Sequence, residues 1–199
     1  MRGSTARWLT GAATILLVAA LACAKHEPPS ADSPPPLPPD LTGQTVMLLP
    51  VQAARGVEPS SLDAELAYWL ADRGRGVRWV LPEAIDRALS RSPGMGLDPR
   101  ALDVSIFFRA EVRRIGDPLF GDLRRLGALL DARWALVPVG GGYVSQPEGS
   151  GRVEVSAALI DTLRGTVLWF GVAGGEPGDA GSPTVVASAA QSFARTFIP

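Results

Sequence analysis

The stretch that decides the fold is Val153-Glu-Val-Ser-Ala-Ala-Leu-Ile-Asp-Thr-Leu-Arg-Gly-Thr-Val-Leu-Trp169. Its first half alternates between larger apolar residues and smaller or polar ones, which is the period of a strand buried mainly on one face. Gly165 can adopt a positive φ, so the chain can turn there and return antiparallel over 166–172. The stretch therefore predicts a β-hairpin near the C-terminus.

Working outward, apolar runs and helical stripes alternate on both sides of this hairpin. We expect strands over 45–51, 77–81 and 134–139, and helices beginning at Pro59, Pro82, Asp117-Pro118 and Ser182-Pro183. Strands mixed with helices predict an α/β fold, a single sandwich domain. It would have a mixed β-sheet with helices packed on it, and a C-terminal β-hairpin followed by a helix.

Local signals refine three of these boundaries. Ser60 and Asp63 have the spacing of a capping box at the start of the first helix, and Gly74 can end that helix. Gly140-Gly141-Gly142 is expected to break the strand before it and form a flexible loop. Residues 93–116 stay open, because both a helix after Asp98-Pro99 and a strand around 104–108 fit the pattern.

The N-terminus has the plan of a secretory signal peptide over residues 1–22. Arg2 and Arg7 precede an apolar run that closes on Ala20-Leu21-Ala22-Cys23. The run is shorter than the roughly 20 residues that span a bilayer. Cys23, the only cysteine, would be the first mature residue, with cleavage between Ala22 and Cys23. Its position resembles the lipobox of bacterial lipoproteins, which implies acylation of its thiol. Plain export, with a free thiol near the terminus, is the alternative.

Residues 23–43 combine this cysteine with a proline-rich tether, and residues 44–199 form the expected α/β domain. The prolines between 28 and 39 favour polyproline II, at about 3.1 Å per residue, so the tether can act as a spacer. The only histidine, His26, lies in the tether and is expected to be solvated. Two acyl chains at Cys23 would make membrane anchoring stable.

Composition excludes several classes of function. Without residues 1–22 the chain has 17 basic and 20 acidic residues, a net charge of −3, which is no footprint of nucleic-acid binding. The folded part has no histidine, cysteine or lysine, so nucleophilic triads, Ser–Lys dyads and Cys/His zinc sites are excluded. No phosphate-binding loop is present. We expect no catalytic residue, no metal and no cofactor.

Paired carboxylates are the one catalytic option that remains. Glu111, Asp122 and Asp131 could supply an acid/base pair, whereas Asp117 is better explained as a helix cap. A second option is a binding module for a glycan or small ligand, with aromatic rings lining a pocket. The tryptophans concerned are Trp79, Trp134 and Trp169, with Trp69 a fourth on an apolar face; core packing is the alternative for all four.

Three stretches together resemble a known group of periplasmic domains. They are Val46-Met-Leu-Leu-Pro-Val51 with the helix after it, Leu126-Gly-Ala-Leu-Leu-Asp-Ala-Arg-Trp134 running into a Val-rich strand, and the hairpin quoted above. They are similar to the α/β domain of curli-secretion lipoproteins, penicillin-binding-protein activator lipoproteins, an exopolysaccharide-export lipoprotein and the N-terminal domain of TolB. Leu129-Leu130 lengthens the usual junction after Gly127, and 93–116 has no counterpart.

The resemblance implies a non-enzymatic envelope lipoprotein that docks on an assembly, export or cell-wall machine. The expected partners are the membrane, through the lipid at Cys23, and an envelope protein; a homo-oligomer is left open. Ala24, in place of Asp after the cysteine, favours the outer membrane, facing the periplasm. The sequence does not assign the docking residues, because exposed and buried apolar side chains look alike in it.

Overall fold

The structure, a computed structural model, describes residues 37–109, 111–146 and 150–199. The predictions for the signal peptide, Cys23, His26 and the tether up to residue 36 lie outside these residues.

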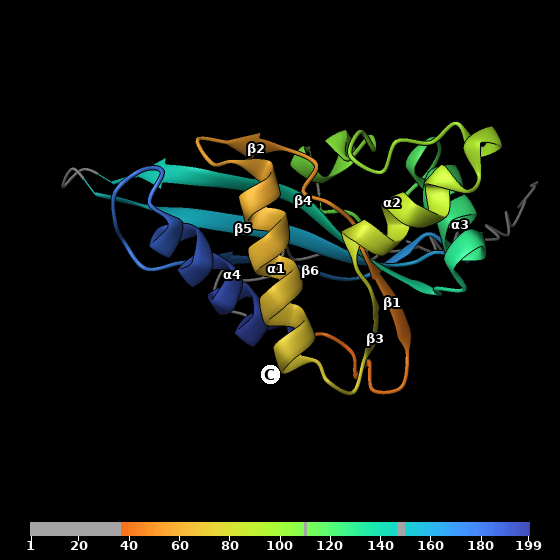
Figure 1. The fold of residues 1–199 in the computed structure, drawn as a ribbon, viewed down its shortest axis with the longest axis horizontal. Coiled ribbons are helices and arrows are strands. Elements are labelled where there is room, and N and C mark those ends of the chain that lie inside the picture. The colour runs from red at the N-terminus through yellow and green to blue at the C-terminus, as the bar shows by residue number, and fades with distance from the viewer. Residues whose placement is uncertain (1–36, 110, 147–149) are drawn as a thin grey trace, which may run out of the picture. The chain divides into compact units, whose positions relative to one another are not determined.

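The described residues form an α/β sandwich, and the predicted fold class is confirmed (Figure 1). A six-stranded mixed sheet has the order β3-β1-β4-β5-β6, with β2 paired to the far half of β4. The strands are β1 (Thr45–Leu48), β2 (Ala54–Arg55), β3 (Arg78–Val80), β4 (Trp134–Ser145), β5 (Gly151–Asp161) and β6 (Thr166–Gly174). The helices are α1 (Pro59–Arg73), α2 (Pro82–Ser90), α3 (Leu119–Leu130) and α4 (Pro183–Phe197), with two short 3-10 helices, η1 (Pro93–Met95) and η2 (Ser105–Phe108).

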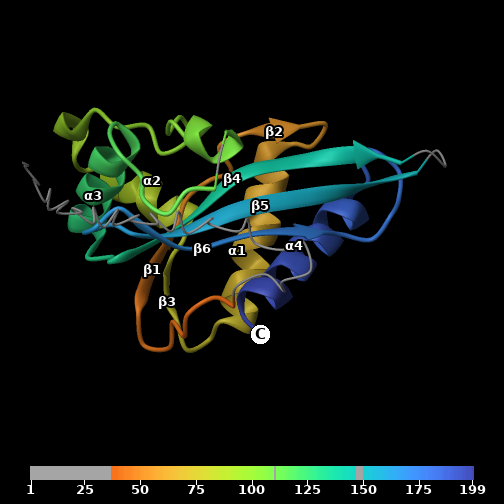
Figure 2. The same ribbon diagram turned by 180° about the vertical axis from the view of Figure 1, so that it is seen from behind.

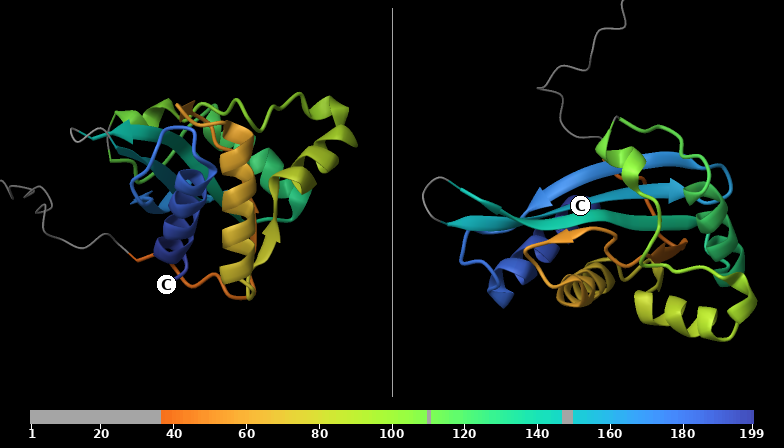
Figure 3. Two further views of the ribbon diagram at one scale, coloured as in Figure 1. Left: turned by 60° about the vertical axis from the view of Figure 1, so that its left-hand side comes forward. Right: turned by 90° about the horizontal axis from the view of Figure 1, so that it is seen from above.

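Each face of the sheet is covered by a different pair of helices (Figure 3). Side chains alternate along a strand, so Val46 and Leu48 of β1 point to one face and Met47 and Leu49 point to the other. The first face packs on α1 and α4, and the second packs on α2 and α3. This double burial explains why the 45–51 run is continuously apolar.

The expected capping box of α1 is wrong. Glu58 occupies the N-cap position without a side-chain cap, and Pro59 begins the helix. Asp63 is instead buried: its Oδ1 accepts a hydrogen bond from the backbone N–H of Val51 at 2.7 Å, and its Oδ2 accepts one from Arg100 at 2.9 Å. Hydrogen bonding to Asp63 raises the pKa of the Arg100 guanidinium. The pair ties α1 to β1 and to the loop before η2. Gly74 does end the helix, as predicted.

The expected break at Gly140-Gly141-Gly142 is also wrong, because β4 continues through the three glycines to Ser145. A Cβ at Gly141 would collide with Leu62 of α1, and one at Gly142 would lie 3.2 Å from the backbone oxygen of Arg55 in β2. These glycines therefore let α1 and β2 approach the strand closely.

The turn of the β5–β6 hairpin is hydrogen-bonded to the junction between α3 and β4. The second and third stretches quoted in the sequence analysis are therefore in contact with each other. The Thr162 hydroxyl donates to the backbone oxygens of Ala132 and Arg133, at 3.2 and 2.9 Å as alternative acceptors. A Cβ on Gly127 would lie 2.7 Å from the Thr162 hydroxyl and 2.8 Å from the Ala132 oxygen. Only glycine fits this contact without a shift of the neighbouring chain. Gly165 turns the hairpin with φ 67°, as predicted.

Residues 93–116 form neither of the two expected elements. They contain η1 and η2, joined by irregular chain, and end by pairing with β6 through an isolated bridge from Arg114 to Thr166. Among the described residues, no helix has the length and apolar character needed to cross a bilayer.

Candidate docking surface

The far halves of β4, β5 and β6 extend beyond α2 and α3, which cover only one end of that side of the sheet (Figure 2). Large apolar side chains are exposed there. We call them the uncovered face: Leu168, Phe170 and Val172 of β6, Val144 of β4, and Phe108 of η2. Phe108 is 61% exposed and Val172 is 55% exposed. Contiguous exposed apolar residues of this kind mark interaction sites.

Strand periodicity explains how β6 supplies both core and surface. Trp169 and Ala173 are buried under α4, and Gly171 between them is buried as well. Phe170 and Val172 therefore point to the opposite side, where no described α-helix covers them and only η2 lies against Phe170. In the sequence this strand is almost uniformly apolar, so its exposed positions could not be told from its buried ones.

A shallow hollow of about 580 Å³ lies on the uncovered face. Val144, Val172 and Phe108 form its apolar wall, and Ser156 and Glu154 of β5 add polar groups. Gly140 and Gly142 contribute no side chain to it, which leaves the sheet accessible. The glycine run, interpreted from the sequence as a loop, thus forms part of the candidate surface.

A second hollow, of about 510 Å³, lies between β6 and the chain around and after η2. Phe107 stacks on Phe170 with ring centroids 5.9 Å apart and ring planes 8° from parallel. Val112 and Leu168 complete its apolar lining, and Glu111 lies at its margin among the lining residues. Aromatic packing therefore holds η2 against the sheet.

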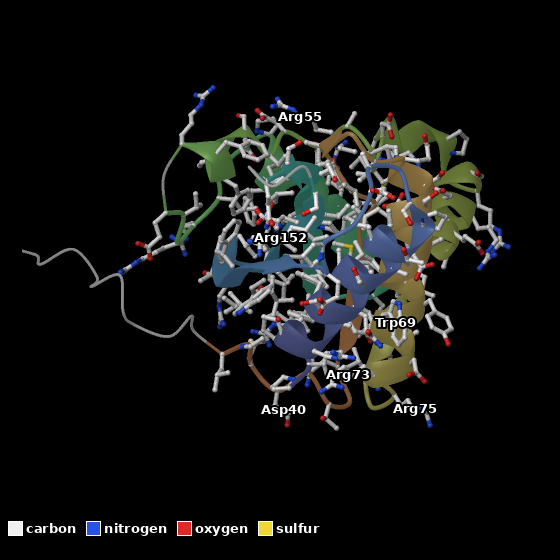
Figure 4. All side chains as sticks on the ribbon, turned by 90° about the vertical axis from the view of Figure 1, so that its left-hand side faces the viewer. Asp40, Arg55, Trp69, Arg73, Arg75 and Arg152 are labelled. Carbon is white, nitrogen blue, oxygen red and sulfur yellow. The ribbon has the colours of Figure 1, made fainter. Side chains whose placement is uncertain are left out.

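Charged groups lie close to the sheet near the start of β5. Arg152 of β5 lies 2.7 Å from the Glu154 carboxylate, and Arg55 of β2 lines the first hollow (Figure 4). Apolar side chains edged by such groups are typical of a protein contact surface, in which a polar rim surrounds an apolar centre.

Asp122 and Asp131 do not form an acid/base pair with each other, and Glu111 lies in the second hollow, which neither aspartate lines. Asp122 lies in the first turn of α3, 2.6 Å from Arg125, and Asp131 follows the last residue of that helix with φ 49°. Nine steps along the helix, at about 1.5 Å each, separate the two by about 14 Å along the axis, more than the roughly 5–10 Å of glycosidase pairs. Asp117 accepts a hydrogen bond from the backbone N–H of Gly121 at 3.0 Å, as expected of a cap.

The candidate tryptophans pack against other side chains or donate hydrogen bonds to groups of the same chain. Trp169 is 2% exposed and packs against Phe197, with ring centroids 5.0 Å apart. Trp79 donates to the backbone oxygen of Gly74 at 3.1 Å. Trp134 donates to Gln44 at 3.1 Å and lies under the Arg133 guanidinium. Trp69, labelled in Figure 4, donates to Glu65. This geometry favours core packing over a ligand pocket built from these rings.

Within the described ranges, no group of three His, Cys, Asp or Glu side chains is placed to hold a metal ion. The most buried carboxylate, Asp161, serves the hairpin turn. Its Oδ1 accepts from the backbone N–H groups of Leu163 and Arg164, and its Oδ2 accepts from Arg133 at 3.0 Å. Its role is structural.

Comparison with known proteins finds distant similarity to several solved structures. No protein-family model matches the chain, and no curated protein matches its sequence. Similar solved structures include the C-terminal domain of LpoB from Escherichia coli, with 14% identity and a TM-score of 0.45 over 69% of this chain and 85% of that one. Lipoprotein GNA1162 from Neisseria meningitidis has 14% identity and a TM-score of 0.43, over 76% and 96%. The PelC dodecamer from Paraburkholderia phytofirmans has 15% identity and a TM-score of 0.37, over 80% and 94%. Similarities this distant do not assign the chain to a family.

Proposed function

We propose that the protein is a non-enzymatic cell-envelope lipoprotein whose α/β domain docks on an envelope assembly, export or cell-wall machine. The observation that carries the proposal is the uncovered face. A domain with two well-packed cores still exposes Phe108, Val144 and Val172 together around one hollow. A protein partner that covered them would remove apolar surface from water, at about 25 cal/mol per Å² before the costs of association.

The anchor is part of the same proposal. Cys23 would carry the acyl chains, with signal cleavage between Ala22 and Cys23, and the prolines after it would hold the domain away from the bilayer. The membrane would be the outer one, facing the periplasm. Restricting the domain to a membrane surface raises its effective concentration near a partner in the same envelope, so a modest contact area suffices.

In-cell cross-linking of a C-terminally tagged full chain, followed by mass spectrometry, tests the proposal. We expect one envelope protein to be captured reproducibly, and its yield to fall about ten-fold or more on Phe108→Asp, because a charge would be placed at the centre of the contact. Cys23→Ala should abolish both palmitate incorporation and capture.

The matched control is Tyr68→Asp, because Tyr68 of α1 is 62% exposed and lies outside the uncovered face. Capture that survives Phe108→Asp but is lost on Tyr68→Asp would contradict the proposed surface. Capture that is unchanged by Cys23→Ala would contradict the requirement for the anchor.

A further inference from the structure

The outer edge of β6 is only half occupied. At its start, Val167 donates its backbone N–H to Arg113 at 2.9 Å, and Ile115 donates to Gly165 at 2.8 Å. Beyond Val167, no described residue forms a backbone hydrogen bond on that side of the strand. A free edge of this kind is a template for another strand.

The register identifies which backbone groups are free. Gly175 donates its backbone N–H to the backbone oxygen of Val153 at 2.9 Å. In an antiparallel pair every second residue is hydrogen-bonded to the neighbouring strand, so Ala173, Gly171 and Trp169 also bond to β5. The N–H and C=O groups of Phe170 and Val172 therefore point away from β5. These same residues expose their side chains on the uncovered face.

Composition leaves this edge unprotected. Thr166–Gly174 contains no charged residue and no proline, the devices that normally block edge-to-edge pairing. The opposite edge of the sheet, β3, has only three residues and includes Arg78.

Exposed charges of opposite sign flank the free stretch. Arg113 and Arg114 lie where the occupied part ends, and Glu176 and Asp179 follow the other end. None of these four takes part in an ion pair within the described chain. Glu111 lies beside the arginines and reduces, without reversing, the positive charge there.

This edge has a basic end and an acidic end. When two copies run antiparallel, the basic end of each edge lies beside the acidic end of the other. A two-fold axis at Gly171 would place Phe170 opposite Val172 of the second copy, which matches the outward-pointing groups of both strands. The same axis would bring Glu176 of each copy to the arginines of the other. Phe170 and Val172 of both copies would then form one continuous apolar strip.

We propose that two copies of this chain pair through antiparallel β6 edges and join their sheets into one. This inference goes beyond the proposed function and does not depend on it. The pairing uses the edge of the sheet, whereas the contact with an envelope partner uses the face around Phe108 and Val144.

Thiol cross-linking in cells tests the pairing with the full chain. Diagonal neighbours across an antiparallel pair are about 7–8 Å apart, within reach of a short bis-maleimide. We expect Val172→Cys to yield a covalent dimer, and Tyr68→Cys, on α1, to yield none. Dimer yield should fall about ten-fold on Glu176→Arg, because like charges would face each other twice. It should recover when Arg113→Glu is added.

Three results would overturn the pairing: a monomer only from Val172→Cys, a dimer of equal yield from Tyr68→Cys, or no recovery in the charge-swapped double variant. Cross-links from Val172→Cys to a different protein, without any covalent dimer of this chain, would also overturn it, while leaving the docking function standing. Equal protein levels and equal resistance to limited proteolysis show that each variant has folded.

Discussion

Trp169→Ala should lower the free energy of unfolding by about 3–5 kcal/mol, the range measured for large aromatic side chains removed from cores. The ring is 2% exposed and lies against Phe193 and Phe197 of α4, with centroids 6.0 and 5.0 Å away. Its loss would leave a cavity between β6 and α4 that the two phenylalanines cannot fill. Urea denaturation followed by far-UV circular dichroism at fixed protein concentration measures the change.

The control for this substitution is Tyr68→Ala, which removes an exposed aromatic ring from α1 and should change stability by less than about 0.5 kcal/mol. A loss below about 1 kcal/mol for Trp169→Ala would mean that the ring is not part of the core. The ligand-pocket interpretation of the tryptophans would then need to be reopened.

Asp161→Asn should cost about 1.5–3 kcal/mol at neutral pH, as expected for a hydrogen bond to a charged group. The asparagine can still accept from the backbone N–H of Leu163, but its NH₂ group would face the donor on Arg133. The hairpin turn would therefore lose its ion pair with Arg133, while the hydrogen bonds of Thr162 to Ala132 and Arg133 would remain. The same denaturation measurement gives the loss.

The cost should also depend on pH. Burial raises the pKa of Asp161, but hydrogen bonds from Arg133, Leu163 and Arg164 outweigh it and hold the pKa below its ordinary value. A carboxyl with a lowered folded-state pKa stabilises the fold above its unfolded pKa of about 3.9, and this contribution is lost as pH falls through the folded value. The difference between the wild type and Asp161→Asn should be full at pH 7 and shrink below about pH 4.

Asp72→Asn provides the comparison, because Asp72 lies 2.7 Å from Arg75 in a solvent-exposed pair. Exposed pairs contribute about 0.2–1 kcal/mol. An equal effect of the two substitutions, or a difference that stays constant down to pH 3, would contradict the role of Asp161.

Elements with a strong local pattern were predictable from the sequence. The β5–β6 hairpin follows from alternation and Gly165, and α2 follows from Pro82 and its apolar stripe. The prediction for the glycine run was wrong because tertiary contacts set its conformation. Gly141 lies within β4 and has no side chain to collide with Leu62 of a distant helix. The predicted capping role of Asp63 was wrong for a similar reason, because its hydrogen-bond partners Val51 and Arg100 are remote in sequence.

The candidate surface could not be predicted. Phe170 and Val172 are apolar residues in a strand whose other face is buried. They are exposed because α2 and α3 do not extend over them, and the sequence does not show where those helices lie. The β6 edge depends on strand order, which the sequence did not specify. The predictions for Ala22, Cys23 and the tether up to residue 36 lie outside the described residues and stay predictions.

The most direct test of the central claim is site-resolved photo-cross-linking in cells. A photoreactive amino acid is placed in the full chain at Phe108, at Val144 or, as a control on α1, at Tyr68. The uncovered face predicts that Phe108 and Val144 capture the same envelope protein and that Tyr68 does not. Capture from Tyr68 alone, or equally from all three positions, would contradict it.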